Sequence, residues 1–265
     1  MINIPLNYFL IFKLDLGISG AAIASSLAEM GSLVVLCIYT RAKIDKVKYG
    51  LKPVYDGRLL IKVLNLSVWS MLHAFISVAP WFLFFVAIEH LGKTELAISN
   101  ITRSVSAIFF VIANSFAVTT ASLVSNAIGA RARNELFPIC HKVLKLGYAV
   151  GIPFVVVALL CNRWIVSFYT DNELLIELAF APFVVMLLNY TFALPGYVYL
   201  NAVGGTGKTK ITFLFQVTTT CAYLVYLYWL SFCIKASLSL YLTAEYLFVI
   251  LLALQSIIYL KSKHY

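Results

Sequence analysis

Two ionisable side chains fall inside long apolar runs of the sequence, where their chemistry would differ from that in water. Arg103 precedes the run 104–130, which contains no Asp, Glu, Lys or Arg, and Glu29 lies near the middle of the run 17–39. A guanidinium stays charged and binds carboxylates, whereas a carboxylate among apolar side chains can take up and release a proton. Charges in such surroundings are costly, which makes both residues candidates for function.

Each of these residues also has a structural interpretation. Arg103 would lie about 10 Å inside a helix that begins near Leu96, so its long side chain could reach outward to the membrane surface. Glu29 could instead be the partner of an Arg or Lys on another helix. Glu245 lies near one end of its run, so a position at the membrane interface is favoured for it over a functional one.

Polar and aromatic residues of the runs form a second set of candidates. His73, Asn114 and Asn189 should face other helices and form hydrogen bonds there, because the bilayer core offers no water. Structural bonding is the first interpretation of these residues, and lining a substrate cavity is the second. Trp81 could stack on cationic compounds, although such rings more often belong to the core or the membrane surface. The pattern indicates neither catalytic nor metal-binding residues.

The composition indicates what surrounds these residues. The 265-residue chain is 62% hydrophobic and 12% charged, whereas soluble proteins contain about 25% charged residues. A formal net charge of +9 could indicate nucleic acid, but the basic residues lie between apolar runs and form no single face. We therefore expect a lipid bilayer as the surroundings and no nucleic-acid partner. The five cysteines have neither disulfide nor zinc-site spacing.

Seven apolar runs are long enough to cross a bilayer as helices, which takes about 20 residues. They predict an all-α polytopic membrane protein. The spans are expected at about 17–39, 63–88, 96–130, 146–168, 178–200, 211–234 and 240–260. Pro182 and Pro195 predict that the fifth span is bent or broken. The connector 131–145 is expected to form an interfacial helix.

Lysine and arginine are distributed unevenly between the two sides of these spans. The loops at 41–62, 131–145, 208–210 and 261–263 hold 15 of the 20, against 4 in the loops on the other side. Because basic loops stay in the cytoplasm, the loop 41–58 and the tail 261–265 are predicted to be cytoplasmic, in a cell (inner) membrane. The segment AVGGTGKT (202–209) lies between two spans, so a tight turn is favoured there over a nucleotide-binding loop.

Three pieces of the sequence, in this order, resemble the multidrug and toxic compound extrusion (MATE) transporters. They are GISGAAIAS in the first span, ASLVSNAIGARARNE at the end of the third, and AVGGTGKTK between two later spans. MATE proteins have twelve helices in two lobes. The resemblance implies that residues 1–16 end a truncated fifth helix and its turn, that 17–40 form the sixth helix of the N-terminal lobe, and that 59–260 form the C-terminal six-helix lobe.

The resemblance also implies a function. It predicts export of small organic or cationic substrates, coupled to H+ or Na+ entry by alternating access between lobes, with no enzymatic reaction and no cofactor. Some members carry cation-binding carboxylates in the seventh and tenth helices, but the spans 63–88 and 178–200 contain neither Asp nor Glu. A coupling carboxylate is therefore expected in the missing N-terminal lobe, with Glu29 as the candidate in this chain. The alternatives are a lipid-linked oligosaccharide flippase, for which Arg103 would supply a cationic cavity, and a non-transporting fragment.

Overall fold

The computed structural model describes residues 3–45, 55–234 and 236–262, which belong to two units, Met1–Leu59 and Leu60–Tyr265. The smaller unit contains α1 (Asn3–Tyr8), a π-helical turn (Phe9–Lys13) and α2 (Gly17–Lys43). The turn lies so close to α2 that a Cβ atom on Gly20 would be 2.8 Å from the carbonyl oxygen of Leu10. Only glycine fits at such a contact.

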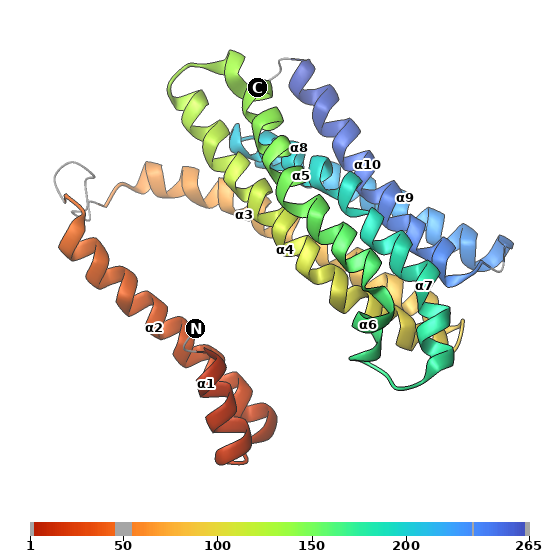
Figure 1. Cartoon of the computed structure of the whole chain (residues 1–265). Helices are drawn as coiled ribbons and strands as arrows, with labels where there is room; N and C mark the ends of the chain where they lie inside the picture. Colours follow the sequence, from red (N-terminus) through yellow and green to blue (C-terminus); the bar gives the residue numbers. More distant parts are fainter. Residues whose placement is uncertain (1–2, 46–54, 235, 263–265) are drawn as a thin grey trace. The chain divides into compact units, whose positions relative to one another are not determined.

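The larger unit is a bundle of long helices (Figure 1). Its α-helices are α3 (Gly57–Glu89), which begins just before the unit boundary, α4 (Lys93–Gly129), α5 (Leu136–Leu160), α6 (Asn162–Ser167), α7 (Glu173–Leu188), α8 (Tyr190–Gly205), α9 (Thr209–Trp229) and α10 (Leu238–Lys261). A 3-10 turn (Arg133–Glu135) precedes α5, and a π-helical turn (Leu230–Ile234) follows α9.

Helix α8 lies at the centre of this bundle, in contact with α4, α5, α9 and α10. Two of its glycines allow the close approaches. A Cβ atom on Gly196 would lie 2.7 Å from the carbonyl oxygen of Val249 in α10, and one on Gly205 would lie 2.6 Å from that of Ala121 in α4. Small residues at such contacts are typical of membrane helices, because packing rather than hydrophobicity drives their association in lipid.

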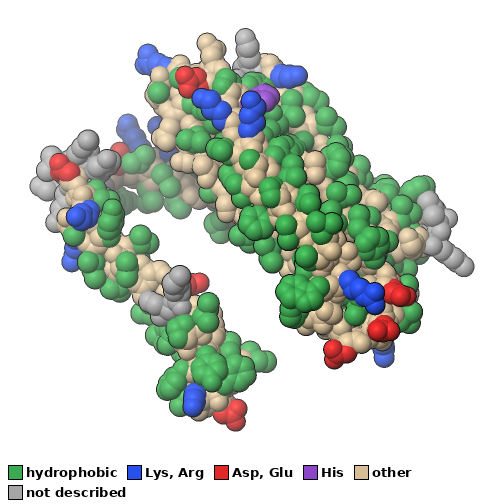
Figure 2. All heavy atoms as spheres, viewed as in Figure 1, with side chains coloured by type: hydrophobic (Ala, Val, Ile, Leu, Met, Phe, Trp, Pro, Cys, Tyr) green, Lys and Arg blue, Asp and Glu red, His purple; other side chains and the backbone are tan. Residues whose placement is uncertain are grey.

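The predicted seven-span, all-α membrane fold is confirmed. Seven helices of the described part of the chain are long and apolar enough to cross a bilayer. In the larger unit, charged side chains gather at the two ends of the bundle and a hydrophobic band lies between them (Figure 2). Many large apolar side chains of this band are exposed, among them Phe75, Val111 and Ile258, as a lipid-facing surface requires.

The prediction for the fourth span was wrong in its limits. Instead of an interfacial helix at 131–145 and a span at 146–168, one helix, α5, runs from Leu136 to Leu160, and the short α6 follows it. The buried side of this helix includes Leu136, Cys140, Val143 and Gly147. One face of α5 therefore packs in the bundle even where the sequence is basic. The exposed lysines of that stretch lie on the opposite face of the helix.

The fifth span is divided at Asn189, between α7 and α8, as its prolines predict. Pro195 has no N–H to donate to the carbonyl oxygen of Thr191, four residues earlier. The Tyr148 hydroxyl of α5 donates to that oxygen instead, at 2.7 Å. A second hydroxyl, from Tyr246 of α10, donates to the Val185 carbonyl oxygen just before the division. Neighbouring helices thus supply the hydrogen bonds that a broken helix in lipid requires.

Candidate functional site

A cavity of about 380 Å³ opens in the larger unit, between α3, α4, α7, α8 and α10. Its wall contains six aromatic side chains. The rings belong to Trp81, Phe109, Phe110, Tyr190, Tyr197 and Phe248. The charged residues of the wall are Arg103 and Glu245. Such a mainly apolar hollow with a few convergent polar groups is typical of sites that bind small organic molecules.

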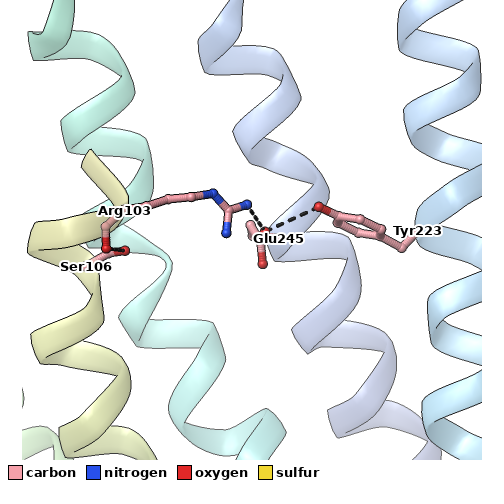
Figure 3. A network of polar contacts seen from close by, with 4 residues as sticks. All are labelled: Arg103, Ser106, Tyr223 and Glu245. Carbon is pink, nitrogen blue, oxygen red and sulfur yellow. Dashed lines mark hydrogen bonds and ion pairs between the residues drawn. The ribbon is translucent and has the colours of Figure 1, made fainter. Parts of the chain in front are cut away.

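Arg103 and Glu245 form an ion pair across this wall (Figure 3). The Arg103 Nη2 donates to the Glu245 Oε1 at 2.6 Å, and the two side chains are 7% and 15% exposed. The Tyr223 hydroxyl of α9 donates to the same oxygen at 3.3 Å. Helices α4, α9 and α10 therefore each contribute one member of the network.

Aromatic rings of α3 hold the guanidinium from another side. The Arg103 Cζ lies 4.0 Å from the centroid of the Phe84 ring and 5.4 Å from that of Phe85. A cation over a ring face is stabilised by the ring quadrupole, by about 2 kcal/mol or more where water is excluded. Phe84 is fully buried. Together these contacts fix the guanidinium in one position at the cavity wall.

Two polar atoms of the wall have no partner among the described residues. They are the Arg103 Nε, a donor, and the Asn189 Oδ1, an acceptor. Both residues are 8% exposed. Buried polar atoms nearly always have a hydrogen-bond partner, in the protein or in ordered water or ligand. Both atoms are themselves covered by neighbouring groups, so the surface that the cavity offers a guest molecule is mainly apolar.

The residues that the sequence singled out are distributed as follows. Arg103, Asn189 and Trp81 all line the cavity. His73 of α3 lies outside the lining, half-buried, with an unpartnered Nε2 atom, and Asn114 of α4 is exposed. The functional roles proposed for them stay predictions.

Glu29 lies in the smaller unit, on α2. Its side chain is exposed, and it has no hydrogen bond or ion pair with another described residue of the chain. A role in carrying a proton or cation stays a prediction for it.

Two structural interpretations are corrected. Arg103 does not reach outward to the membrane surface, because its side chain is buried and paired. Glu245 does not face water as an exposed interfacial acid would, because its side chain is 15% exposed and pairs with Arg103. The helix-end argument for Glu245 weighed only depth along the helix, and that depth stays a prediction. The direction of the side chain, toward the Arg103 guanidinium, decides its surroundings.

A family comparison identifies the kind of bundle that holds this site. The model of the MatE family matches residues 70–229, which include α4 to α9 entirely and most of α3. The chain belongs to the MatE family. The predicted MATE resemblance is thereby confirmed.

Curated relatives agree with the assignment to the MatE family. Protein DETOXIFICATION 48 of Arabidopsis thaliana is 26% identical over 187 residues, 66% of this chain and 34% of its own length. Multidrug and toxin extrusion protein 1 of Oryctolagus cuniculus is 23% identical over 185 residues, 67% of this chain and 32% of its own length. The chain thus matches about a third of the length of these relatives.

Solved structures of MATE proteins show the same fold. A MATE protein carrying a single substitution superposes with a TM-score of 0.85 at 16% identity, covering 99% of this chain and 59% of its own. A multidrug resistance MATE family transporter in an outward-facing conformation gives a TM-score of 0.84 at 15% identity, covering 100% and 61%. A MOP superfamily transporter from Pyrococcus furiosus gives 0.83 at 16% identity, covering 98% and 60%.

Proposed function

We propose that this chain supplies the C-terminal lobe of a secondary active exporter of organic compounds, coupled to the entry of H+ or Na+. Membership of the MatE family supports a transporter rather than an enzyme. The aromatic cavity, with its buried ion pair, is the observation that carries the proposal. Alternating access requires a second lobe facing this one. We therefore propose that transport takes place in an assembly in which an N-terminal six-helix lobe closes the cavity.

The ion pair also favours drug export over the flippase alternative. A flippase for an acidic lipid-linked oligosaccharide would need a cationic cavity. Here the Glu245 carboxylate balances the only positive charge in the described cavity wall, that of Arg103. The wall therefore carries no net charge in this state, and six of its side chains are aromatic. Aromatic faces suit flat organic compounds, neutral or cationic.

Filling the cavity is expected to slow transport. Ala107 is a small, exposed residue of α4 that lines the cavity. We expect Ala107→Trp to slow export by about ten-fold, because a clash of ~1–3 kcal/mol with a bound guest corresponds to roughly that factor. Drug accumulation in cells producing the two-lobe protein measures the effect.

The matched control is Ile108→Trp, which adds the same ring at an exposed position of α4 that lies outside the cavity lining. It should transport like the unaltered protein. Equal transport by both variants at equal protein levels would exclude the cavity as the substrate site. Equal loss in both would mean that the substitutions act through the fold.

We further propose that the basic loops and the C-terminus face the cytoplasm, in the inner membrane. Asp171, between α6 and α7, and Lys208, between α8 and α9, are exposed at opposite ends of the fifth span.

Single cysteines at these two positions, in a background without the native cysteines, test the orientation. An impermeant thiol reagent added to intact cells should label Asp171→Cys, and should label Lys208→Cys only after the membrane is opened. The reverse pattern would show the opposite orientation. The physical reason is the 15-to-4 distribution of basic residues.

A further inference from the structure

The buried face of α9 is polar, although the helix lies in the membrane-spanning bundle. Its buried residues are Thr212, Gln216, Thr219, Thr220, Tyr223 and Leu227. Their spacing of three and four residues places them on one side of the helix. Burying polar groups in an apolar bundle costs free energy unless they are hydrogen-bonded. A row of five therefore calls for partners.

Several of these groups have none within the described chain. The unpartnered atoms are Gln216 Nε2, Thr219 Oγ1 and Thr220 Oγ1 on α9, and Ser256 Oγ on the adjacent α10. Gln216 is 2% exposed, and Thr219 and Ser256 are fully buried. The hydroxyl of the exposed Thr218, by contrast, donates to the Phe215 carbonyl oxygen of the preceding turn. Buried polar atoms without a partner in the protein call for another one, such as an ordered water molecule.

The row connects two distinct places in the bundle. At one end, the Tyr223 hydroxyl donates to the Glu245 carboxylate. At the other end, the Thr212 hydroxyl donates to the Thr209 carbonyl oxygen, in the first turn of α9. Between Thr212 and Tyr223 the helix rises about 16 Å. The polar face therefore covers the distance from the buried ion pair to the end of α9 that follows Lys208.

We propose that this face, which we call the α9 seam (Thr212, Gln216, Thr219 and Thr220, with Ser256 of α10), holds a file of water molecules that conducts protons to Glu245. Buried waters typically make about three hydrogen bonds to polar groups that lack other partners. Gln216, Thr219, Thr220 and Ser256 provide such groups. The seam would thus be the ion path of the exporter, and H+ rather than Na+ its coupling ion. This role in coupling rests on the proposed function, but conduction along the seam does not.

The chemical step is one proton transfer. A hydronium in the seam gives its proton to a Glu245 carboxylate oxygen and becomes water, and the carboxylate becomes a neutral acid. The Arg103 guanidinium keeps its proton, so the net charge of the pair changes from zero to +1. The loss of charge on Glu245 removes the Coulomb attraction that holds Arg103, while Tyr223 can still donate to the acid. Proton release to the seam reverses the step.

None of the other described groups that face Glu245 competes with it for the incoming proton. They are Arg103 from α4, which stays protonated, Tyr223 from α9, and Tyr197 from α8, which lines the same cavity. From α3 and α7 the cavity wall presents groups that do not titrate, including Trp81 and Met186. The described wall holds no second acid that would compete for the proton.

Infrared spectroscopy of oriented proteoliposomes that contain this chain tests the seam without any transported drug. The pH is lowered only on the side of the Lys208 turn, and the carboxylic-acid band of Glu245, assigned by its loss in Glu245→Gln, is followed in time. We expect Thr219→Val to slow the appearance of the band by about ten-fold, the factor for a barrier higher by roughly 1.4 kcal/mol. Gln216→Leu should act similarly.

Two further variants separate conduction from packing. Thr219→Ser restores the hydroxyl and should restore the rate, and Thr218→Val makes the same chemical change on the exposed face of α9 and should leave the rate unaltered. If Thr219→Val does not fold, Thr219→Ala compared with Thr219→Ser gives the same test. Protonation of the Thr219 and Gln216 variants at the unaltered rate would overturn the proposal.

Failure of the exporter proposal gives a different result. If a drug-accumulation assay of the two-lobe protein shows no export while the seam variants still slow the infrared band, the seam stands and the proposed function fails. If export is present but the band is insensitive to the seam variants, the seam fails and the exporter proposal stands.

Discussion

Glu245→Leu is expected to destabilise the larger unit by about 3–5 kcal/mol, because it leaves the charge of Arg103 buried without a partner. The Arg103 side chain is 7% exposed, and its guanidinium donates to the Glu245 carboxylate at 2.6 Å. Its contact with the Phe84 ring remains in the variant but carries no negative charge. The double variant Arg103→Met with Glu245→Leu should regain most of the loss, because replacing both members of a buried pair with apolar residues is often nearly neutral.

Denaturant unfolding of the purified chain in detergent measures these differences as a double-mutant cycle. Glu177→Leu serves as the control, since Glu177 is an exposed acid of α7, and should change stability by no more than about 0.5 kcal/mol. The prediction fails if the double variant is as unstable as the sum of the two single variants, which would mean that the pair contributes no coupling energy.

The fold could be predicted from the sequence because hydropathy alone determines most of it. A span needs a long uncharged run, and each of the seven runs became a helix of sufficient length. The predicted limits of the fourth span were wrong. Lysines on one face of α5 indicated a polar connector, but the helix already begins at Leu136. Which face of a helix packs in the bundle depends on its neighbours, and a count of charges along the run does not contain that information.

The site could be predicted only in part. Arg103 was identified because a charge in an apolar run is conspicuous, but its partner was assigned to the membrane interface. The sequence did contain a usable signal: Glu245 is the only acid within the predicted spans of the segment 59–260. A buried guanidinium requires an acid or water, so elimination pointed to this residue. The prolines predict a break in the fifth span, but not its place at Asn189. The contribution of Tyr223 depends on helix packing, which no local pattern specifies.

In the proposed two-lobe exporter, Arg103→Ala is expected to shift the preference of the cavity toward cationic compounds, relative to neutral ones of similar size. The substitution removes the positive member of the pair and leaves the Glu245 carboxylate in the cavity wall. A unit charge about 5 Å from a bound cation contributes roughly 3 kcal/mol at an effective dielectric constant of about 20. The shift in relative resistance should therefore be about ten-fold or more.

Two variants make the electrostatic origin of this shift testable. Arg103→Lys retains the charge opposite Glu245 and should keep the preference of the unaltered protein, although it loses the planar contact with the Phe84 ring. The double variant Arg103→Met with Glu245→Leu has no charge in the wall and should also show no shift, despite lacking the arginine. Resistance to paired cationic and neutral compounds, at equal protein levels, gives the measurement. If Arg103→Ala transports both classes as the unaltered protein does, Arg103 serves only to join α4 to α10, because a cargo beside an unbalanced carboxylate would have to sense its charge.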